Sequence, residues 1–142
     1  MAEYFSRFGA VKKYLDGSVE EARQRGYTQT MYGRRRYLPA LQSSSRPQRE
    51  MAERAALNSP IQGTAADIMK IAMFRIADAL AEADLASRIL LQVHDEVIVE
   101  CAAGEFDSLE KIVVDTMRDA AELSVPLDVN VGRGPDWQSA AH

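Results

Sequence analysis

Residues 90–99 read Leu-Leu-Gln-Val-His-Asp-Glu-Val-Ile-Val, so three polar residues separate two apolar runs. Short apolar runs rich in β-branched residues are typical of strands, and this pattern predicts a β-hairpin with strands over residues 88–93 and 96–101. Two-residue hairpin turns favour Asn-Gly or Asp-Gly because they require positive φ angles. The triplet His94-Asp95-Glu96 is costly in such a turn, which indicates that these side chains do more than reverse the chain.

The chain upstream of this hairpin contains a predicted helix and a second, basic hairpin. Apolar residues at helical spacing predict an amphipathic helix over residues 3–24 that ends before Gly26. Residues 27–32 and 34–38 flank Gly33, and this arrangement predicts a short β-hairpin.

Two helices are predicted between the hairpins, one on each side of Ser59-Pro60. After a loop over residues 40–46, Pro47 fits the first turn of a helix that runs up to this dipeptide. Proline lacks an N–H and disfavours helical angles in the residue before it, so Ser59-Pro60 predicts a break. Ser59 and Gln62 match a capping box, and a new helix is expected from Pro60 to about Leu80. Its predicted buried stripe consists of Ile61, Ala65, Ile68, Ala72, Ile76 and Ala79.

The remainder of the chain completes the predicted fold class. A helix is expected from about Glu105 to Leu123, followed by a last strand, Leu127–Val131. These elements together predict an α+β fold in which a small antiparallel sheet packs against helices.

The composition is that of one compact domain. The 142 residues are 46% apolar, and no apolar run approaches the roughly 18 residues that span a bilayer, so no membrane association is expected. No signal-peptide pattern is present at the N-terminus, and a cytoplasmic protein is expected. Cys101 is the single cysteine, and His94 and His142 are the only histidines, which excludes an internal disulfide and a Cys- or His-rich zinc site.

Charge is divided unevenly along the chain. Residues 1–54 contain 11 Lys and Arg against 6 Asp and Glu, a net charge of +5, whereas residues 55–142 contain 6 against 15, a net charge of −9. A basic segment beside an acidic one suits phosphate contacts and cation-binding carboxylates, with an ordinary solvated surface as the alternative.

Asp95 lies at the predicted tip of the central hairpin, where its carboxylate can reach over a cleft. Adjacent carboxylates on a tight turn suit Mg²⁺, a hard cation that binds oxygen ligands. A solvated polar turn without a ligand is the alternative.

Arg54, Asn58 and Gln62 are spaced four residues apart, so they would line one face of a continuous helix. Their donors match the acceptors that every base pair presents in the minor groove. A structural role is the alternative, because the predicted break at Pro60 would rotate Gln62 relative to the other two.

Arg34, Arg35 and Arg36 follow the predicted turn at Gly33. Guanidinium groups bind phosphate by charge and by paired hydrogen bonds, so this basic hairpin could contact a nucleic-acid backbone. Basic turns are also common on ordinary protein surfaces.

Five motifs occur in a fixed order: Gly26-Tyr27; Gly33-Arg-Arg-Arg-Tyr-Leu-Pro39; Glu53-Arg-Ala-Ala-Leu-Asn-Ser-Pro-Ile-Gln-Gly-Thr-Ala-Ala-Asp67; Gln92-Val-His-Asp-Glu-Val97; and Val131-Gly-x-Gly-x-x-Trp137. On these motifs the chain closely resembles the C-terminal palm part of bacterial family A DNA polymerases, over essentially its whole length. The resemblance implies that residues 1–40 form a helix and basic hairpin that follow the nucleotide-binding helix of the fingers. Residues 41–142 would then form the C-terminal part of the palm.

The resemblance assigns roles to the turn residues. In that family the aspartate of the Val-His-Asp-Glu turn is one of two that hold the catalytic metals, so Asp95 is expected to ligate Mg²⁺. Glu96 is expected to have a supporting role, and His94 to lie near the primer terminus.

The resemblance also implies partners and an activity. It places Arg54, Asn58 and Gln62 along the minor groove of the DNA primer–template, whereas Arg34 and Arg35 would contact the DNA backbone or form a structural edge. The implied activity is template-directed nucleotidyl transfer in DNA replication and repair, with deoxynucleoside triphosphates as substrates of the complete enzyme.

Two parts of the family pattern are missing: the upstream motif with the other metal aspartate, and the fingers helix that binds the incoming nucleotide. Ser45 also stands where asparagine is usual in the family. A fragment is therefore expected, inactive alone because one carboxylate turn cannot position two Mg²⁺ ions, and prone to self-association through an exposed palm edge. The alternatives are a non-catalytic DNA-binding fragment and a truncated gene product.

Overall fold

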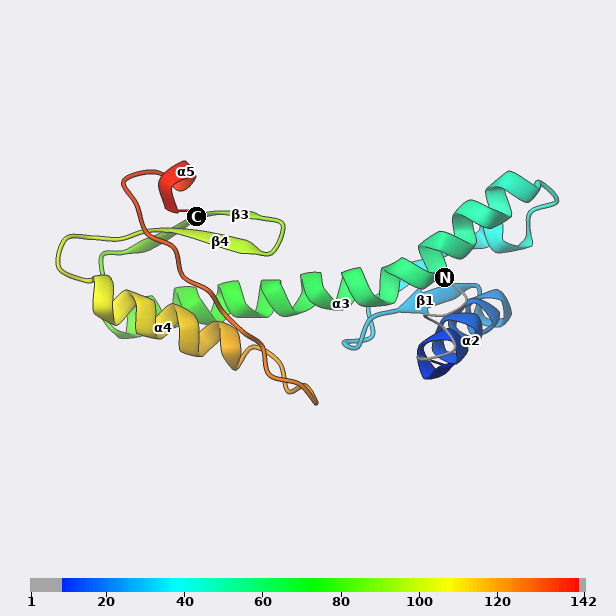
Figure 1. The fold of residues 1–142 in the computed structure, drawn as a ribbon, viewed down its shortest axis with the longest axis horizontal. Helices are drawn as coiled ribbons and strands as arrows, with labels where there is room; N and C mark the ends of the chain where they lie inside the picture. The colour runs from blue at the N-terminus through cyan, green and yellow to red at the C-terminus, as the bar shows by residue number, and fades with distance from the viewer. Residues whose placement is uncertain (1–8, 141–142) are drawn as a thin grey trace. The chain divides into compact units, whose positions relative to one another are not determined.

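Residues 9–140 are described by the computed structural model, in which the chain divides into two compact units between Asp67 and Ile68. The first unit contains α2 (Gly9–Arg25), β1 (Tyr27–Gln29), β2 (Arg35–Tyr37), the 3₁₀-helix η1 (Pro39–Gln42) and the beginning of α3 (Arg46–Glu82). The second contains the remainder of α3, β3 (Arg88–Val93), β4 (Glu96–Glu100), α4 (Phe106–Arg118) and α5 (Trp137–Ala140). Helices and two separate two-stranded antiparallel sheets confirm the predicted α+β class (Figure 1).

Helix α2 and the β1–β2 hairpin confirm the elements predicted for the start of the chain, although the first part of the predicted helix lies outside the described residues. The helix ends at Arg25, and Gly26 takes a φ of 78° that glycine adopts readily, while its N–H bonds to the carbonyl of Ala22 at 2.8 Å. The hairpin pairs Tyr27 with Tyr37 and turns at Gly33, which has a φ of 82°.

The core of the first unit is built largely from small side chains. It joins α2, the segment after β2 and the first turns of α3 through Ala22, Leu38, Leu41, Ala52 and Ala56. Ala56 is completely buried. Alanine lets backbones approach closely, so α3 lies near the elements that carry the basic hairpin.

The predicted helix break at Ser59-Pro60 is wrong, because α3 continues from Arg46 to Glu82 with Pro60 inside it. Proline removes the N–H that would bond to the carbonyl of Ala56, at a cost of about 3 kcal/mol in a helix interior. Contacts with the hairpin support this segment: Thr64 Oγ1 donates to the Pro60 carbonyl at 2.6 Å and accepts the Met31 N–H at 3.0 Å. The predicted capping box is therefore also wrong, since Ser59 is not a helix N-terminus.

The buried stripe predicted for α3 is correct only in its second half. Ala72 and Ile76 are buried, but Ile61 and Ala65 are exposed. The first part of the helix packs within the first unit through Ala52 and Ala56, and the later part packs within the second unit through Ile76 and Leu80, so the predicted stripe describes only the later part.

The core of the second unit lies between α3, α4 and one face of the β3–β4 hairpin. Ile76 and Leu80 of α3 and Leu109 of α4 are its buried residues, with Ile89 and Val99 from the strands packed against them. Strands β3 and β4 lie within one residue of their predicted ranges, and a register shift between Ile89 and Leu91 interrupts their ladder. In Figure 1 the hairpin and α4 both lie alongside the C-terminal half of α3.

Two predictions for the end of the chain are wrong. Helix α4 ends at Arg118 rather than near Leu123. At this end the Arg75 side chain donates to the carbonyl of Asp119, the residue that follows the helix, at 2.7 Å. The strand expected over Leu127–Val131 is not formed, since that segment pairs with neither β3 nor β4 in the described structure. A strand requires a hydrogen-bonded neighbour, and the apolar pattern alone cannot provide one.

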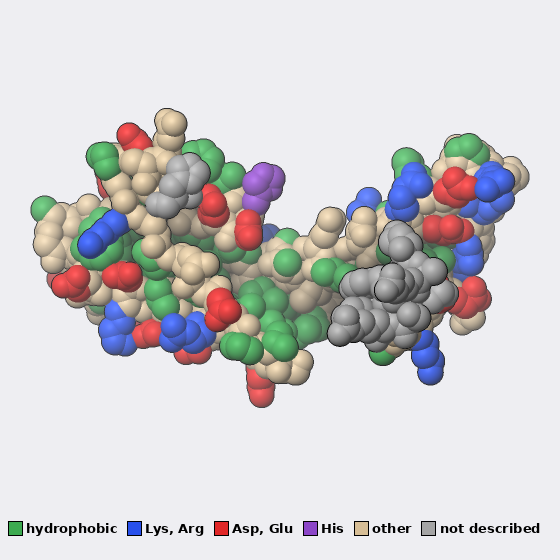
Figure 2. Space-filling model, viewed as in Figure 1, with side chains coloured by type: hydrophobic (Ala, Val, Ile, Leu, Met, Phe, Trp, Pro, Cys, Tyr) green, Lys and Arg blue, Asp and Glu red, His purple; other side chains and the backbone are tan. Residues whose placement is uncertain are grey.

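Several large apolar side chains remain at the surface, as the green areas of Figure 2 show. Phe74 is 67% exposed, and Leu90 of β3 is 52% exposed. Exposed apolar surface is consistent with the expectation for a partial domain. None of the helices described between residues 9 and 140 is long and apolar enough to cross a membrane.

Candidate functional site

The three polar residues of the predicted minor-groove row lie on one uninterrupted helix. Arg54, Asn58 and Gln62 are all exposed on α3, and the helix passes through Pro60 without a break. Residues four and eight positions apart lie within about 80° of each other around a helix, so the row faces one direction. The continuity of α3 removes the objection that a break would turn Gln62 away.

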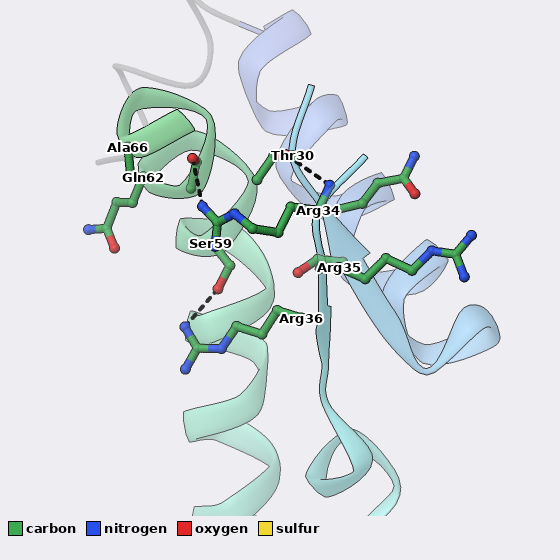
Figure 3. A pocket seen from close by; sticks show the side chains of 10 residues that line it. Thr30, Arg34, Arg35, Arg36, Ser59, Gln62 and Ala66 are labelled. Atoms are coloured by element: carbon green, nitrogen blue, oxygen red, sulfur yellow. Dashed lines mark hydrogen bonds between the residues drawn. The ribbon is translucent and has the colours of Figure 1, made fainter. Parts of the chain in front are cut away.

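The side chain of Arg34, in the basic hairpin, is hydrogen-bonded to α3. Its Nε donates to Oδ1 of Asp67 at 2.7 Å, and its guanidinium Nη2 donates to the carbonyl of Gly63 at 2.9 Å. Its backbone N–H donates to Oγ1 of Thr30 at 3.2 Å. In Figure 3 the Arg34 side chain reaches toward α3, which matches the structural alternative of the sequence analysis. The contacts with Asp67 and Gly63 fix the hairpin against the helix.

Gly63 makes this close approach possible. A Cβ at this position would lie 2.7 Å from Cγ2 of Thr30 and 3.4 Å from Nη2 of Arg34. The segment Gln-Gly-Thr-Ala-Ala-Asp therefore has a physical explanation: Gly63 gives space, Thr64 accepts the Met31 N–H and Asp67 binds Arg34. We call these three residues with Arg34 the hairpin clamp. Sequence reasoning missed it, because its partners lie about thirty positions away.

The other two hairpin arginines have different neighbours. The guanidinium of Arg35 lies 4.6 Å from the ring centroid of Tyr27, a cation–π contact, and its side chain points away from α3 (Figure 3). Arg36 donates to Oγ of Ser59 at 3.0 Å. Neither of these described contacts pairs the guanidinium of Arg35 or Arg36 with a carboxylate, so both charges suit a phosphate partner better than that of Arg34 does.

A hollow of about 230 Å³ lies between the hairpin and α3. It is lined by Thr28, Gln29, Thr30, Arg34, Arg35, Arg36, Ser59, Gln62, Gly63 and Ala66. Its lining includes three arginines, and Gln62 of the row stands at its edge with the amide directed away from the hairpin (Figure 3).

The carboxylate turn lies in the second unit, between β3 and β4. Val93 pairs with Glu96, so His94 and Asp95 form a two-residue turn with both side chains exposed. His94 takes a φ of 52°, in the left-handed region, whereas Asp95 does not have a positive φ. Glycine is favoured at this position, so a histidine here stores strain of about 1–3 kcal/mol.

Glu96, the first residue of β4, is held by the end of the chain. Trp137 donates its indole N–H to Oε2 of Glu96 at 3.2 Å. The side-chain amide of Gln92 in β3 donates to the carbonyl of His94 and supports the turn from within the hairpin. The exposed carboxylate of Asp95 therefore stands beside a glutamate that already has a partner.

The turn fits Mg²⁺ by the chemistry of its donors, since carboxylate oxygens are the ligands this cation prefers. Among residues 9–140 no group of three or more His, Cys, Asp or Glu side chains is arranged to hold a metal. The turn offers two adjacent exposed carboxylates, Asp95 at its tip and Glu96 at the start of β4.

The opposite end of the hairpin is fixed by Glu105. This carboxylate accepts the N–H of Ala86 at 2.9 Å, and the N–H and hydroxyl of Ser87 at 2.9 and 2.6 Å. The Ser87 hydroxyl also accepts the N–H of Ala102 at 3.0 Å. Hydrogen bonding, first from the Ser87 hydroxyl and then from the Ala86 N–H, lowers the pKa of Glu105 below its usual value. The hairpin that carries Asp95 is thus anchored at its base.

The sequence profile of DNA polymerase family A matches residues 1–139. The chain belongs to this family. Curated members of family A similar to it are DNA polymerase I of Mycobacterium tuberculosis strain H37Rv, 59% identical over 142 residues, and DNA polymerase I of Bacillus subtilis, 49% identical over 137 residues. These alignments cover 100% and 96% of this chain but 16% of each relative, so the chain spans about one sixth of their length.

A solved structure of family A has the same fold. The POL domain of Pol1 from M. smegmatis, in complex with DNA primer-template and dNTP, matches with a TM-score of 0.98 and 56% identity. The match covers 100% of this chain and 25% of that one. The chain is therefore a partial family A polymerase domain with an α+β fold.

Proposed function

We propose that this chain is the C-terminal palm part of a family A DNA polymerase, and that it supplies minor-groove contacts and one metal-binding carboxylate for template-directed DNA synthesis by a larger enzyme. The observation that carries the proposal is the exposed row of Arg54, Asn58 and Gln62 on an uninterrupted α3. The relatives are DNA polymerases of which this chain spans 16%, so the activity belongs to the whole enzyme.

The row suits the minor groove by its spacing and its chemistry. Residues four apart on a helix rise by about 6 Å, close to two base-pair steps of about 3.4 Å. Arg54, Asn58 and Gln62 thus donate to acceptors on alternate base pairs. Because all four base-pair orientations present these acceptors, the row holds the primer–template without reading its sequence.

The turn acts on the reacting end of the primer. Asp95 would hold Mg²⁺ from the tip, and a second carboxylate would come from another part of the enzyme. When bound, the metal pair lowers the pKa of the primer 3′-hydroxyl and stabilises the charge of the triphosphate. Glu96 supports the turn through Trp137, and His94 lies beside Asp95, toward the primer terminus.

The DNA-binding part of the proposal is tested by titrating the chain with duplex DNA at several salt concentrations. Asn58→Ala and Gln62→Ala are expected to weaken binding several-fold without changing the salt dependence, because each removes an uncharged donor. Arg54→Ala is expected to weaken binding and to reduce the slope of log K against log salt by about one. Asn130→Ala, an exposed asparagine in the second unit, is the control and is expected to bind as the parent chain does.

The catalytic part is tested by primer extension. The chain alone is expected to extend no primer, because the single turn lacks the second metal carboxylate. A longer chain that includes the upstream coding sequence is expected to be active and to lose activity with Asp95→Asn. Robust extension by the 142-residue chain alone, abolished by Asp95→Ala, would contradict the proposal.

DNA binding without catalysis is the second candidate function, favoured because residues 9–140 contain no cluster of three or more metal-binding side chains. The longer chain distinguishes the two. A non-catalytic module would bind DNA with the same row but would remain inactive when the upstream sequence is restored.

A further inference from the structure

The segment at the end of the chain touches the remainder of the second unit at two defined points. The guanidinium of Arg133 lies 4.5 Å from the ring centroid of Phe106, the first residue of α4. Trp137 donates to the carboxylate of Glu96, the first residue of β4. The segment therefore connects the start of α4 to the turn end of the hairpin.

The internal geometry of this segment is specified by glycine and aspartate. A Cβ on Gly132 would overlap the carbonyl oxygen of Ala140, and a Cβ on Gly134 would overlap the hydroxyl of Ser139. Asp136 accepts the N–H of Ser139 at 2.9 Å and its hydroxyl at 2.7 Å. The motif Val-Gly-x-Gly-x-x-Trp thus encodes a chain that folds back tightly on itself and presents the indole.

We propose that residues 132–140 are a positioning element for the carboxylate turn, and that Trp137 is the positioning residue that acts through Glu96. The function of the turn rests on the proposed polymerase role, but the contact itself does not. A hydrogen bond from a neutral donor to a carboxylate is stronger than one between neutral groups, so it restrains the Glu96 side chain. Because Glu96 adjoins Asp95, a fixed Glu96 also fixes the end of the turn from which Asp95 projects.

The hydrogen bond from Trp137 gives the two neighbouring carboxylates, Asp95 and Glu96, different roles. Glu96 is the first residue of β4 and Asp95 belongs to the turn before it, and of the two it is Glu96 whose side chain the tail contacts through Trp137. Both side chains are exposed. The bond to Trp137 keeps Glu96 as an orienting group, and Asp95 at the tip is the carboxylate that a divalent cation reaches. Loss of the indole donor releases Glu96 to compete for that cation.

The contact can be observed directly, because Trp137 is the only tryptophan in the chain and gives a single indole N–H signal in a ¹⁵N NMR spectrum. Glu96→Gln retains an acceptor oxygen and is expected to leave this signal near its original position. Glu96→Ala is expected to shift it and to increase its solvent exchange several-fold. Glu122→Ala, which removes an exposed glutamate elsewhere in the second unit, is expected to change neither property.

Positioning is tested from the other direction with Trp137→Phe, which keeps an aromatic ring but removes the donor. The backbone amides of residues 94–97 are expected to exchange several-fold faster, while those of α4 exchange as before. Gly132→Ala is expected to reproduce this effect from a position outside the turn, because its Cβ would overlap Ala140 and displace the segment. Gly17→Ala is the control, because a Cβ there meets no atom within 4 Å.

A Mg²⁺ titration followed at the same amides separates this inference from the proposed function. If Asp95 binds the cation, the shifts of residues 94–97 are lost in Asp95→Asn and change in apparent affinity in Trp137→Phe. An unresponsive turn in the parent chain would contradict the metal role of Asp95 and leave the amide-exchange result to decide on positioning. Unchanged turn amides in both Trp137→Phe and Gly132→Ala would overturn the positioning role, whatever the titration gives.

Discussion

Nε of Arg34 lies 2.7 Å from Oδ1 of Asp67, and this ion pair joins the β1–β2 hairpin to helix α3 within the first unit. The Asp67 side chain is mostly buried, with 16% exposed, whereas that of Arg34 is 58% exposed. Because the pair is partly buried, it contributes more to stability than an exposed pair does, and the hydrogen bond to the Gly63 carbonyl adds to this contribution. Arg34 thus has a structural contact within this unit, while its role toward DNA stays a prediction.

Arg34→Ala is expected to lower the free energy of unfolding by about 1 kcal/mol, because it removes both the ion pair and the bond to Gly63. Urea unfolding followed by circular dichroism measures the change. Arg46→Ala is the matched control, since Arg46 forms an exposed pair with Glu50 in the same helix and its loss is expected to cost less than about 0.5 kcal/mol. Equal losses in the two variants would show that the hairpin clamp adds no stability.

Gly63→Ala is expected to destabilise the chain by about 1–3 kcal/mol, because the added methyl group would overlap Cγ2 of Thr30. Gly17→Ala, in the open face of α2, is expected to gain up to about 1 kcal/mol from helix propensity. Adding Thr30→Ser to Gly63→Ala removes the overlapping methyl and keeps the hydroxyl, so it is expected to recover part of the loss. A double variant no more stable than Gly63→Ala would contradict the steric explanation.

The lowered pKa of Glu105 predicts a contribution to stability that depends on pH. The folded state favours the ionised carboxylate, so the unfolded state binds more protons in the acid range. The contribution is complete above the usual glutamate pKa of 4.5 and is lost as the pH falls through the lower folded value. Glu105→Gln is expected to flatten this part of the curve of unfolding free energy against pH. Glu122→Gln removes an equal charge and is expected to keep the slope; identical curves for the two variants would refute the assignment.

Pro60→Ala is expected to stabilise the chain, because alanine restores an N–H that can bond to the Ala56 carbonyl. The gain is bounded by the roughly 3 kcal/mol that proline costs in a helix interior. Thermal unfolding of the variant tests this, with Pro126→Ala as a control at an exposed proline outside the helices. A lower melting temperature for Pro60→Ala would mean that the hairpin contacts depend on the proline geometry.

Local signals predicted the elements whose causes are local. The β3–β4 hairpin was predicted within one residue, because strand composition and a short polar turn determine it. The end of α2 followed from Gly26, whose φ is 78°. For the site, exposure of Asp95 and of the Arg54–Asn58–Gln62 row agrees with the prediction, whereas their roles toward metal and DNA stay predictions.

Distant contacts account for what the sequence could not predict. Helix α3 passes Pro60 because Thr64 and Ser59 bind hairpin residues that lie 33 and 23 positions away. The bond between Trp137 and Glu96 spans 41 positions. A short window of neighbouring residues does not contain these distant partners. In the segment 127–131 the apolar pattern predicted a strand, but the segment has no partner strand to pair with in the described structure.

The strained backbone of His94 has a consequence for how this hairpin could be engineered. A glycine there would relax the left-handed backbone and make the turn easier to form by about 1 kcal/mol or more. The same change would remove the imidazole of His94 from the tip of the turn. Stability and the proposed function thus compete at this residue, because the glycine that would stabilise the turn would remove the side chain that the proposal places toward the primer terminus.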